Sequence, residues 1–95
     1  MNIVVVGAGA IGKERIKCLE ELPNNVITAI VDPDNDVYMN SIYPVYSDIR
    51  EVNLTDIDWV FICTPHNVSA KIVDMAMKND CKVLVEKPLM AKYDK

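Results

Sequence analysis

The fold is decided by the stretch IVVVGAGAIG, which occupies residues 3–12. Four consecutive β-branched residues without polar alternation predict a strand that is buried on both faces, as in a parallel sheet. Three glycines follow with the spacing G-x-G-x-x-G, and an amphipathic segment then predicts a helix over residues 10–22. The stretch therefore reads as a strand, a glycine-rich turn and the start of a helix.

Each glycine of this turn has its own physical role. Gly7 permits a tight turn, and Gly12 allows the helix to pack closely on the strand. Gly9 lets a pyrophosphate approach the backbone because it has no Cβ, and the free N–H groups of the helix start would hold the phosphates. A plain strand-to-helix turn without a ligand is the alternative, but such a turn does not need three glycines at this spacing.

Further strands follow along the chain and predict the fold class. Apolar, strand-like segments occupy residues 26–31, 59–63 and 82–85, and a very short one occupies residues 45–46. Strands that alternate with helical segments and lack polar alternation indicate an open parallel α/β sheet. The sequence contains no internal repeat and no low-complexity segment.

The helical segments between these strands differ in clarity. Residues 67–79 have apolar residues at helical spacing, with Asn67 or Ser69 as the expected N-cap. Asn79 and Asp80 are expected to close this helix, because both residue types tolerate left-handed geometry. Shorter helical turns are predicted over residues 37–43 and 47–51.

Asp32 ends the second strand, 20 residues after Gly12. A carboxylate at this place can accept hydrogen bonds from an adenosine ribose, and it would repel a 2′-phosphate. No Lys or Arg follows nearby, since the next residues are Pro33-Asp34-Asn35-Asp36. NAD(H) is therefore favoured over NADP(H). The alternative is that Asp32 only begins an Asp-Pro turn.

The segment Thr64-Pro65-His66-Asn67 follows the strand at residues 59–63. Ligands of open α/β sheets bind outside the carboxyl ends of the strands, so Thr64 and Asn67 are candidate contacts to the cofactor. A strand end followed by a proline and an N-cap is also ordinary architecture. His66, the only histidine, is expected to be a solvated loop residue and is given no acid–base role.

Glu86-Lys87-Pro88 follows the last predicted strand at the same edge of the sheet. The two charges are candidates for contacts to the substrate or the nicotinamide. A lysine beside a positively charged nicotinamide would have a lowered pKa and could transfer a proton. The alternative is a solvated ion pair.

Length and composition limit the chain to one small domain. It has 95 residues and a net charge of −4, which argues against nucleic acid as a partner. No apolar run approaches the roughly 20 residues of a membrane span. The N-terminus lacks the features of a signal peptide, so the expected location is the cytoplasm. Three scattered cysteines are expected to be small core residues rather than disulfide or zinc ligands, and they are Cys18, Cys63 and Cys81.

Taken together, these motifs resemble the Gfo/Idh/MocA oxidoreductases, a family that includes glucose-fructose oxidoreductase and inositol dehydrogenase. The resemblance covers roughly residues 2–91. It rests on the glycine turn, Asp32, Thr64-Pro65 and the sequence VLVEKPL at residues 83–89. Its most specific part is the spacing from Thr64-Pro65 through a helix to Glu86-Lys87-Pro88.

The resemblance implies a Rossmann-type doubly wound parallel sheet of about five strands, truncated before the sixth strand and the substrate domain. Residues 1–95 would be the NAD(P)-binding domain of an NAD-dependent enzyme that transfers hydride between NAD(H) and a carbon of a sugar or polyol. The isolated chain would bind the cofactor without turnover. No nucleic-acid or membrane partner is expected, and the unpaired edge of an incomplete sheet invites homo-oligomers.

By matching motif, the resemblance also assigns roles to residues. The pyrophosphate would be lined by the first motif, at Gly7, Gly9, Ala10, Ile11 and Gly12. Asp32 would hold the ribose, Thr64 and Pro65 the middle of the cofactor, and Glu86 and Lys87 the nicotinamide side. Lys87 would also assist deprotonation of the substrate, as the one catalytic residue on this chain. No metal is implied.

The chain departs from the family pattern at several positions. Many members carry His five residues after the Thr of Thr-Pro, where this chain has Ser69, and the helix before the last strand usually ends in Gly rather than Asp80. The segment from Asp32 to Val45 is short, so one crossover helix is expected to be stunted.

Two alternative functions remain open. The chain could be a stand-alone, non-enzymatic NAD-binding or redox-sensing module that docks on a partner. The same fold could also bind S-adenosylmethionine, although the Glu86-Lys87-Pro88 match argues against that ligand.

Overall fold

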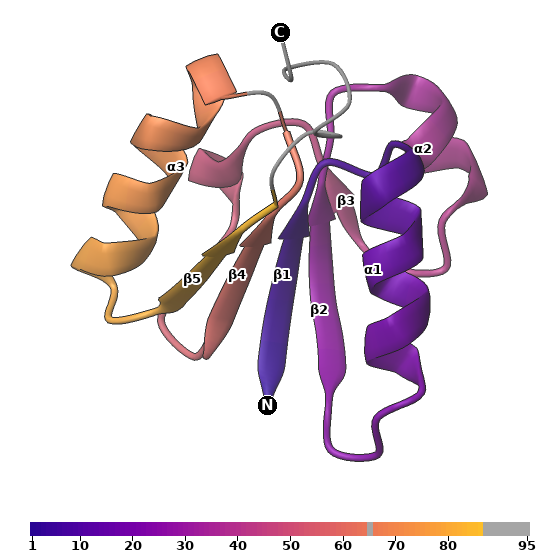
Figure 1. The fold of residues 1–95 in the computed structure, drawn as a ribbon. Coiled ribbons are helices and arrows are strands. Elements are labelled where there is room, and N and C mark those ends of the chain that lie inside the picture. The colour runs from indigo at the N-terminus through magenta and orange to yellow at the C-terminus, as the bar shows by residue number, and fades with distance from the viewer. Residues whose placement is uncertain (65, 87–95) are drawn as a thin grey trace, which may run out of the picture.

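Five parallel strands form one sheet in the computed structural model of the chain, which describes residues 1–64 and 66–86 (Figure 1). The strands are β1 (Asn2–Val6), β2 (Val26–Val31), β3 (Val45–Tyr46), β4 (Trp59–Ile62) and β5 (Lys82–Val85). Their order is β3-β2-β1-β4-β5, so the chain builds outward from β1 in one direction and then in the other. The predicted open parallel sheet is confirmed, and the reversal between β1 and β4 marks its topological switch point.

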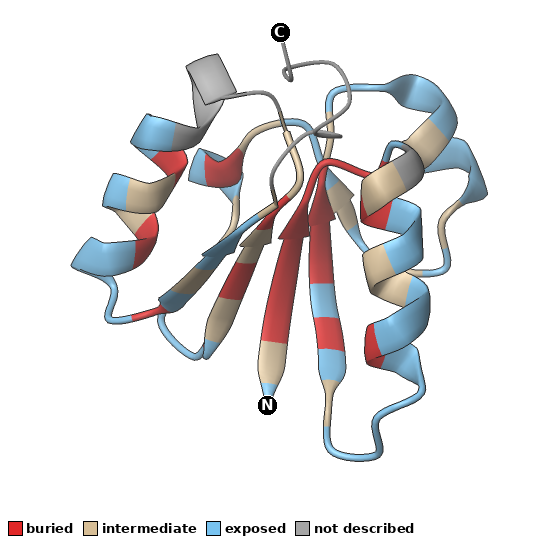
Figure 2. Ribbon diagram, in the orientation of Figure 1, coloured by how far each residue is buried: buried red, intermediate tan, exposed pale blue. Residues whose placement is uncertain are grey.

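The predicted first strand, β1, is the centre of the sheet and of the core. Its residues Ile3 to Val6 are all buried (Figure 2). Ile3 and Val5 face one hydrophobic cluster, whereas Val4 and Val6 face the other. A strand with a helix layer on each side needs apolar residues at every position, which explains why this segment lacks polar alternation.

The helices cover the two faces of the sheet unequally. On the face with Ile3 and Val5, α1 (Ala10–Glu20) contributes Leu19 to the core. On the opposite face, α3 (His66–Lys78) contributes Ile72 and Ala76. Figure 1 shows α1 beside β2 and α3 at the other flank of the sheet, so the two helices form separate layers.

Two helix boundaries differ from those expected. The first helix ends at Glu20, and Leu22 lies beyond it with 54% of its surface exposed. Helix α3 starts at His66, so Asn67 and Ser69 lie inside it and neither is its N-cap. The C-terminal end is confirmed, because Asp80 has a left-handed φ of 61°.

The shorter elements are present, but the helical turn predicted over residues 37–43 begins and ends earlier. The crossover after β2 contains only α2 (Asn35–Asn40), which buries none of its residues. The turn after β3 is a 3₁₀ helix, η1 (Ile49–Glu51), with Asp48 and Glu51 forming a capping box. The stunted crossover helix and the capped turn are thus both confirmed.

Burial corrects two expectations. Strand β5 is apolar but lies at an edge of the sheet, and Leu84 is 38% exposed. Of the three free cysteines, only Cys81 is buried. Cys63 is half-buried and Cys18 is exposed, because Cys18 lies on the outer side of α1.

Two features are absent from the described residues. None of the helices in residues 1–64 and 66–86 has the length and hydropathy of a membrane span. The same residues contain no group of three His, Cys, Asp or Glu side chains that could hold a metal ion.

Candidate functional site

The carboxyl ends of the central strands are joined by backbone hydrogen bonds. Three N–H groups that directly follow strands donate to the neighbouring strand end: Gly7 to Val31, Cys63 to Val6 and Glu86 to Ile62, at 2.7, 2.8 and 2.8 Å. The glycine turn, the segment after β4 and the segment after β5 therefore start in one row along this edge, as the parallel topology predicts.

The three glycines of the turn have different surroundings. Gly7 has a φ of +90°, and a Cβ there would lie 2.9 Å from Cγ2 of Thr64. A Cβ at Gly12 would lie only 2.0 Å from the carbonyl oxygen of Gly7, so the helix packs directly on the turn. At Gly9, by contrast, a Cβ would have no atom within 4 Å, which leaves open space beside the backbone.

The start of α1 presents backbone donors to this open space. Gly9 is the N-cap, and the first backbone bond of the helix runs from the N–H of Lys13 to the carbonyl of Gly9, at 2.9 Å. The N–H groups of Ala10, Ile11 and Gly12 precede it, and such groups have no partner within a helix. Together with the positive end of the helix dipole, they can bind an anion.

Asp32 lies directly beside the glycine turn. Its Oδ2 accepts a hydrogen bond from the backbone N–H of Ala8, at 2.7 Å, and its Oδ1 accepts one from the N–H of Asp34, at 2.9 Å. These bonds fix the carboxylate at the end of β2. Each carboxylate oxygen has a second acceptor position, so Asp32 can still accept hydrogen bonds from a ligand hydroxyl.

A crevice of about 520 Å³ opens at the switch point between β1 and β4. Its lining includes Gly7, Gly9 and Asp32 from the first half of the sheet, and Cys63 and Thr64 from the second. The hydroxyl oxygen of Thr64 is buried and has no hydrogen-bond partner among the described residues. Since an unpaired buried hydroxyl is unfavourable, this atom is suited to bond a ligand in the crevice.

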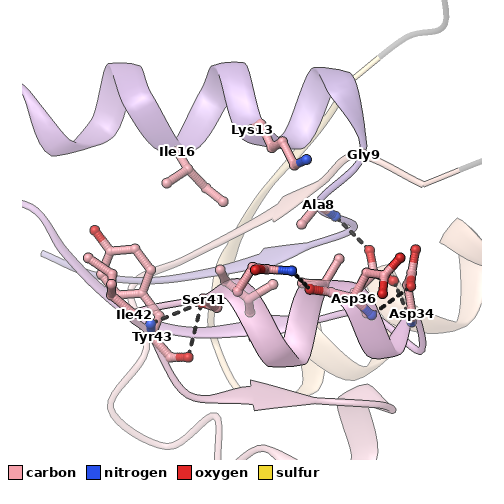
Figure 3. Close-up of a pocket in the computed structure, with 13 residues that line it drawn as sticks. Ala8, Gly9, Lys13, Ile16, Asp34, Asp36, Ser41, Ile42 and Tyr43 are labelled. Carbon is pink, nitrogen blue, oxygen red and sulfur yellow. Dashed lines mark hydrogen bonds between the residues drawn. The ribbon is translucent and has the colours of Figure 1, made fainter.

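A second cavity of about 530 Å³ lies between α1 and α2 (Figure 3). Its inner surface is apolar and includes Ile16, whereas Asp34 and Asp36 lie at the end near Ala8. At the opposite end, the hydroxyl group of Tyr43 donates to Glu20, and this bond raises the pKa of Tyr43 to about 12.

An ion pair between Arg15 and Glu86 joins α1 to the end of β5. Nε of Arg15 donates to Oε2 of Glu86 at 2.5 Å. Burial and, to a smaller extent, the charge of Glu86 raise the pKa of the nearby Cys63 thiol to about 11, against a lowering effect of the charge of Arg15. The sequence offered no sign of this pair, because 71 residues separate its members.

The structure brings together most of the residues that the sequence singled out. Gly7, Gly9, Gly12, Asp32 and Thr64 meet around the crevice. Ala10 is the first residue of α1, Asn67 is the second residue of α3, and Glu86 follows β5. Pro65 and Lys87 lie outside the described residues.

Sequence reasoning missed the part of the crevice formed after β3. Ser47, Asp48 and Ile49 line it, since β3 is parallel to its neighbours and ends at the same edge. The topology could have indicated these residues, because every parallel strand delivers its following loop to this edge.

The sheet order, the glycine turn and the acidic end of β2 define a dinucleotide-binding domain of the Rossmann type. Comparison with known families agrees: the sequence model described as "Oxidoreductase family, NAD-binding Rossmann fold" matches residues 1–95. The chain therefore belongs to the Gfo/Idh/MocA oxidoreductase family.

Individual proteins are similar over nearly the whole chain. The uncharacterized oxidoreductase YrbE of Bacillus subtilis is 30% identical over 95% of this chain, which corresponds to 28% of YrbE. The inositol 2-dehydrogenase of Renibacterium salmoninarum is also 30% identical, over 94% of this chain and 29% of that enzyme. The chain thus spans less than a third of the length of these relatives.

A solved structure supports the same relationship. GenD2 from gentamicin A biosynthesis, determined in complex with NAD, superposes with a TM-score of 0.80. It is 27% identical, and the match covers 94% of this chain and 27% of GenD2. The similarity therefore extends over little more than a quarter of GenD2.

Proposed function

We propose that this chain binds NAD(H) as the cofactor domain of an oxidoreductase that transfers hydride to or from a CH–OH carbon of a sugar or polyol. One observation carries the proposal. The open space beside Gly9 lies at the N-terminus of α1, next to the carboxylate of Asp32 and within one crevice. A pyrophosphate and an adjoining ribose need these two features side by side.

NAD(H) is favoured over NADP(H) by the charges near the ribose position. Asp32 is followed by Asp34 and Asp36, and a 2′-phosphate would meet these carboxylates. In the part of the chain that the structure describes, no Lys or Arg lines the crevice, and Lys13 lines the same neighbouring cavity as Asp34 and Asp36. Carboxylates outnumber this cation around the ribose position, so a 2′-phosphate is disfavoured.

The remaining site residues follow from the family motif. The backbone of the turn would hold the pyrophosphate, Thr64, Pro65 and Asn67 the middle of the cofactor, and Glu86 with Lys87 the nicotinamide side. When bound, the nicotinamide supplies the hydride acceptor or donor. Lys87 would assist removal of the hydroxyl proton from the substrate.

The substrate class rests on relatives rather than on this chain. One relative is an inositol 2-dehydrogenase, which suggests a polyol or sugar as substrate. Because the chain spans only 28–29% of the curated relatives, we expect NADH binding by these 95 residues without turnover.

A fluorescence titration with NADH tests the proposal. The folded chain should bind NADH saturably and more tightly than NADPH. Asp32→Ala should weaken binding by about tenfold, since the lost hydrogen bonds to the ribose involve a charged acceptor. Asp32→Asn, which keeps one acceptor for the turn, should also weaken it, and circular dichroism reports whether each variant is folded.

The matched control is Asp56→Ala, which removes an exposed carboxylate near Asn2, at the opposite edge of the sheet. Its affinity should equal that of the wild type. A folded chain that does not bind NADH would contradict the proposal. An unchanged affinity in both Asp32 variants would contradict the ribose role.

A further inference from the structure

The Arg15–Glu86 pair connects two parts of the site that the sequence motifs treat separately. Arg15 lies in the second turn of α1, the helix whose first turn faces the pyrophosphate position. Glu86 directly follows β5, and its N–H is bonded to Ile62, so its backbone is fixed to the sheet. The guanidinium therefore ties the glycine-turn helix to the end of another strand.

Because the pair is partly buried, losing one of its partners is more unfavourable than in a surface ion pair. The side chain of Glu86 is 17% exposed and that of Arg15 is 36% exposed. A carboxylate removed from water in this way is unfavourable without a cation, and removing the cation leaves a buried unpaired charge. Near Cys63, which lines the crevice, such a charge would also act on an anionic ligand bound there.

We propose that Arg15 is a positioning residue of the NAD(H) site, which neutralises Glu86 and holds it against α1 without contacting the cofactor itself. This inference rests on the proposed function. It adds Arg15, which lies outside the sequence motifs, to the residues of the site. It also means that the carboxylate of Glu86 is paired and neutralised. A free carboxylate at that place would be a base or an anion facing the cofactor.

Cys63 offers an internal reporter of the same pair. Its thiol senses both charges, since Glu86 raises its pKa and Arg15 lowers it. Loss of Arg15 and loss of the Glu86 charge should therefore change the reactivity of Cys63 in opposite directions. A general loosening of the fold would increase the reactivity in both cases.

The first test measures NADH affinity in four variants of the chain. Arg15→Met should weaken binding by roughly threefold to tenfold, the range of coupling within one charge network. The double variant Arg15→Met with Glu86→Gln should bind NADH more tightly than Arg15→Met alone, because no unpaired charge remains. Arg15→Lys should keep most of the affinity, and Lys17→Met is the matched control, since it removes an exposed charge from the same helix.

Two results of this test would overturn the inference. Arg15→Met could bind NADH as the wild type does, or the double variant could bind as weakly as Arg15→Met alone. The second result would mean that Arg15 acts on the helix or the phosphates rather than through Glu86.

The second test needs no cofactor and separates this inference from the proposed function. Alkylation of Cys63 by iodoacetamide is followed by mass spectrometry, which distinguishes it from Cys18 and Cys81. Arg15→Met should slow the alkylation of Cys63 and Glu86→Gln should accelerate it. Equal rates, or acceleration in both variants, would overturn the pairing, whereas a wild type that fails to bind NADH would overturn the function alone.

Discussion

At the scale of single residues, two glycines three positions apart in one turn have opposite surroundings. A Cβ on Gly12 would lie 2.0 Å from the carbonyl oxygen of Gly7, and both partners are backbone atoms that cannot rotate away. A Cβ on Gly9 would point into open space. Gly12 is therefore required by packing, whereas the absence of a side chain at Gly9 matters only when a ligand approaches.

Alanine substitutions should separate these two roles. Gly12→Ala should lower the free energy of unfolding by about 1–3 kcal/mol, because the turn must shift to accept the methyl group. Gly9→Ala should cost about 1 kcal/mol or less, the difference between Gly and Ala at an N-cap, yet weaken NADH binding by about tenfold or more. Urea denaturation and NADH titration measure the two effects.

Each variant serves as the control for the other. If Gly12→Ala were as stable as the wild type, α1 would not pack on Gly7 as described. If Gly9→Ala kept full affinity for NADH, the pyrophosphate would not approach the backbone at this residue.

Asp32 shows which features of a site residue can be predicted from the sequence and which cannot. Its place at the end of β2 followed from the sequence, and two readings were open, a ribose ligand and the start of a turn. The structure contains the turn, since Oδ1 accepts the N–H of Asp34, and it adds a bond to Ala8 that spacing could not indicate. The turn and a ribose contact use different acceptor positions, so the two readings are compatible.

At the scale of the elements, the C-terminal end of α3 has a strained residue that tests the geometry directly. Asp80 has a φ of 61°, a conformation in which a Cβ is unfavourable. Asp80→Gly should raise the free energy of unfolding by up to about 1 kcal/mol, because glycine has no such penalty. Asp80→Val should lower it by about 1–2 kcal/mol, since β-branched residues tolerate this region least.

Urea denaturation measures these differences, and Asp80→Asn is the matched control because Asn also tolerates the left-handed region. Its stability should lie close to that of the wild type. Equal stability of the Gly and Val variants would contradict a left-handed residue at this helix end.

Elements with a strong hydrophobic period were predictable, and those fixed by tertiary contacts were not. The buried run of β1 and the apolar spacing of α3 identified both elements. The start of α3 was misplaced because Asn67 and Ser69 are good N-cap types, whereas the helix already begins at His66. The exposure of β5 was missed, because an apolar edge strand has the same composition as a central one.

At the scale of the whole molecule, the two faces of the sheet are filled to different degrees. The face toward α3 forms a cluster that runs from β2 to β4, whereas α1 covers mainly β1 and β2. Trp59 and Phe61 of β4 are only partly buried on the α1 side, and Leu84 of β5 is exposed. Sequence patterns predicted the sheet but not this asymmetry, which depends on where each helix crosses.

Cys63 and Tyr43 have pKa values well above their ordinary ranges. Burial and the charge of Glu86 raise the pKa of Cys63 from 9.0 to about 11. The hydrogen bond to Glu20 is the main reason why the pKa of Tyr43 rises from 10.0 to about 12. In both cases the folded protein favours the protonated, uncharged form.

This difference predicts the stability of the whole molecule at alkaline pH. Between pH 9.0 and about 12 the unfolded chain binds fewer protons at these two residues than the folded chain does, so the free energy of unfolding should fall as the pH rises. Urea denaturation at several pH values measures the slope. Tyr43→Phe should remove the contribution of the tyrosine to the slope between pH 10.0 and about 12, because phenylalanine does not titrate, while the contribution of Cys63 between pH 9.0 and about 11 persists. A free energy of unfolding that stays constant over this range, or a slope that is identical in Tyr43→Phe, would contradict the hydrogen bond that joins α1 to the segment before β3.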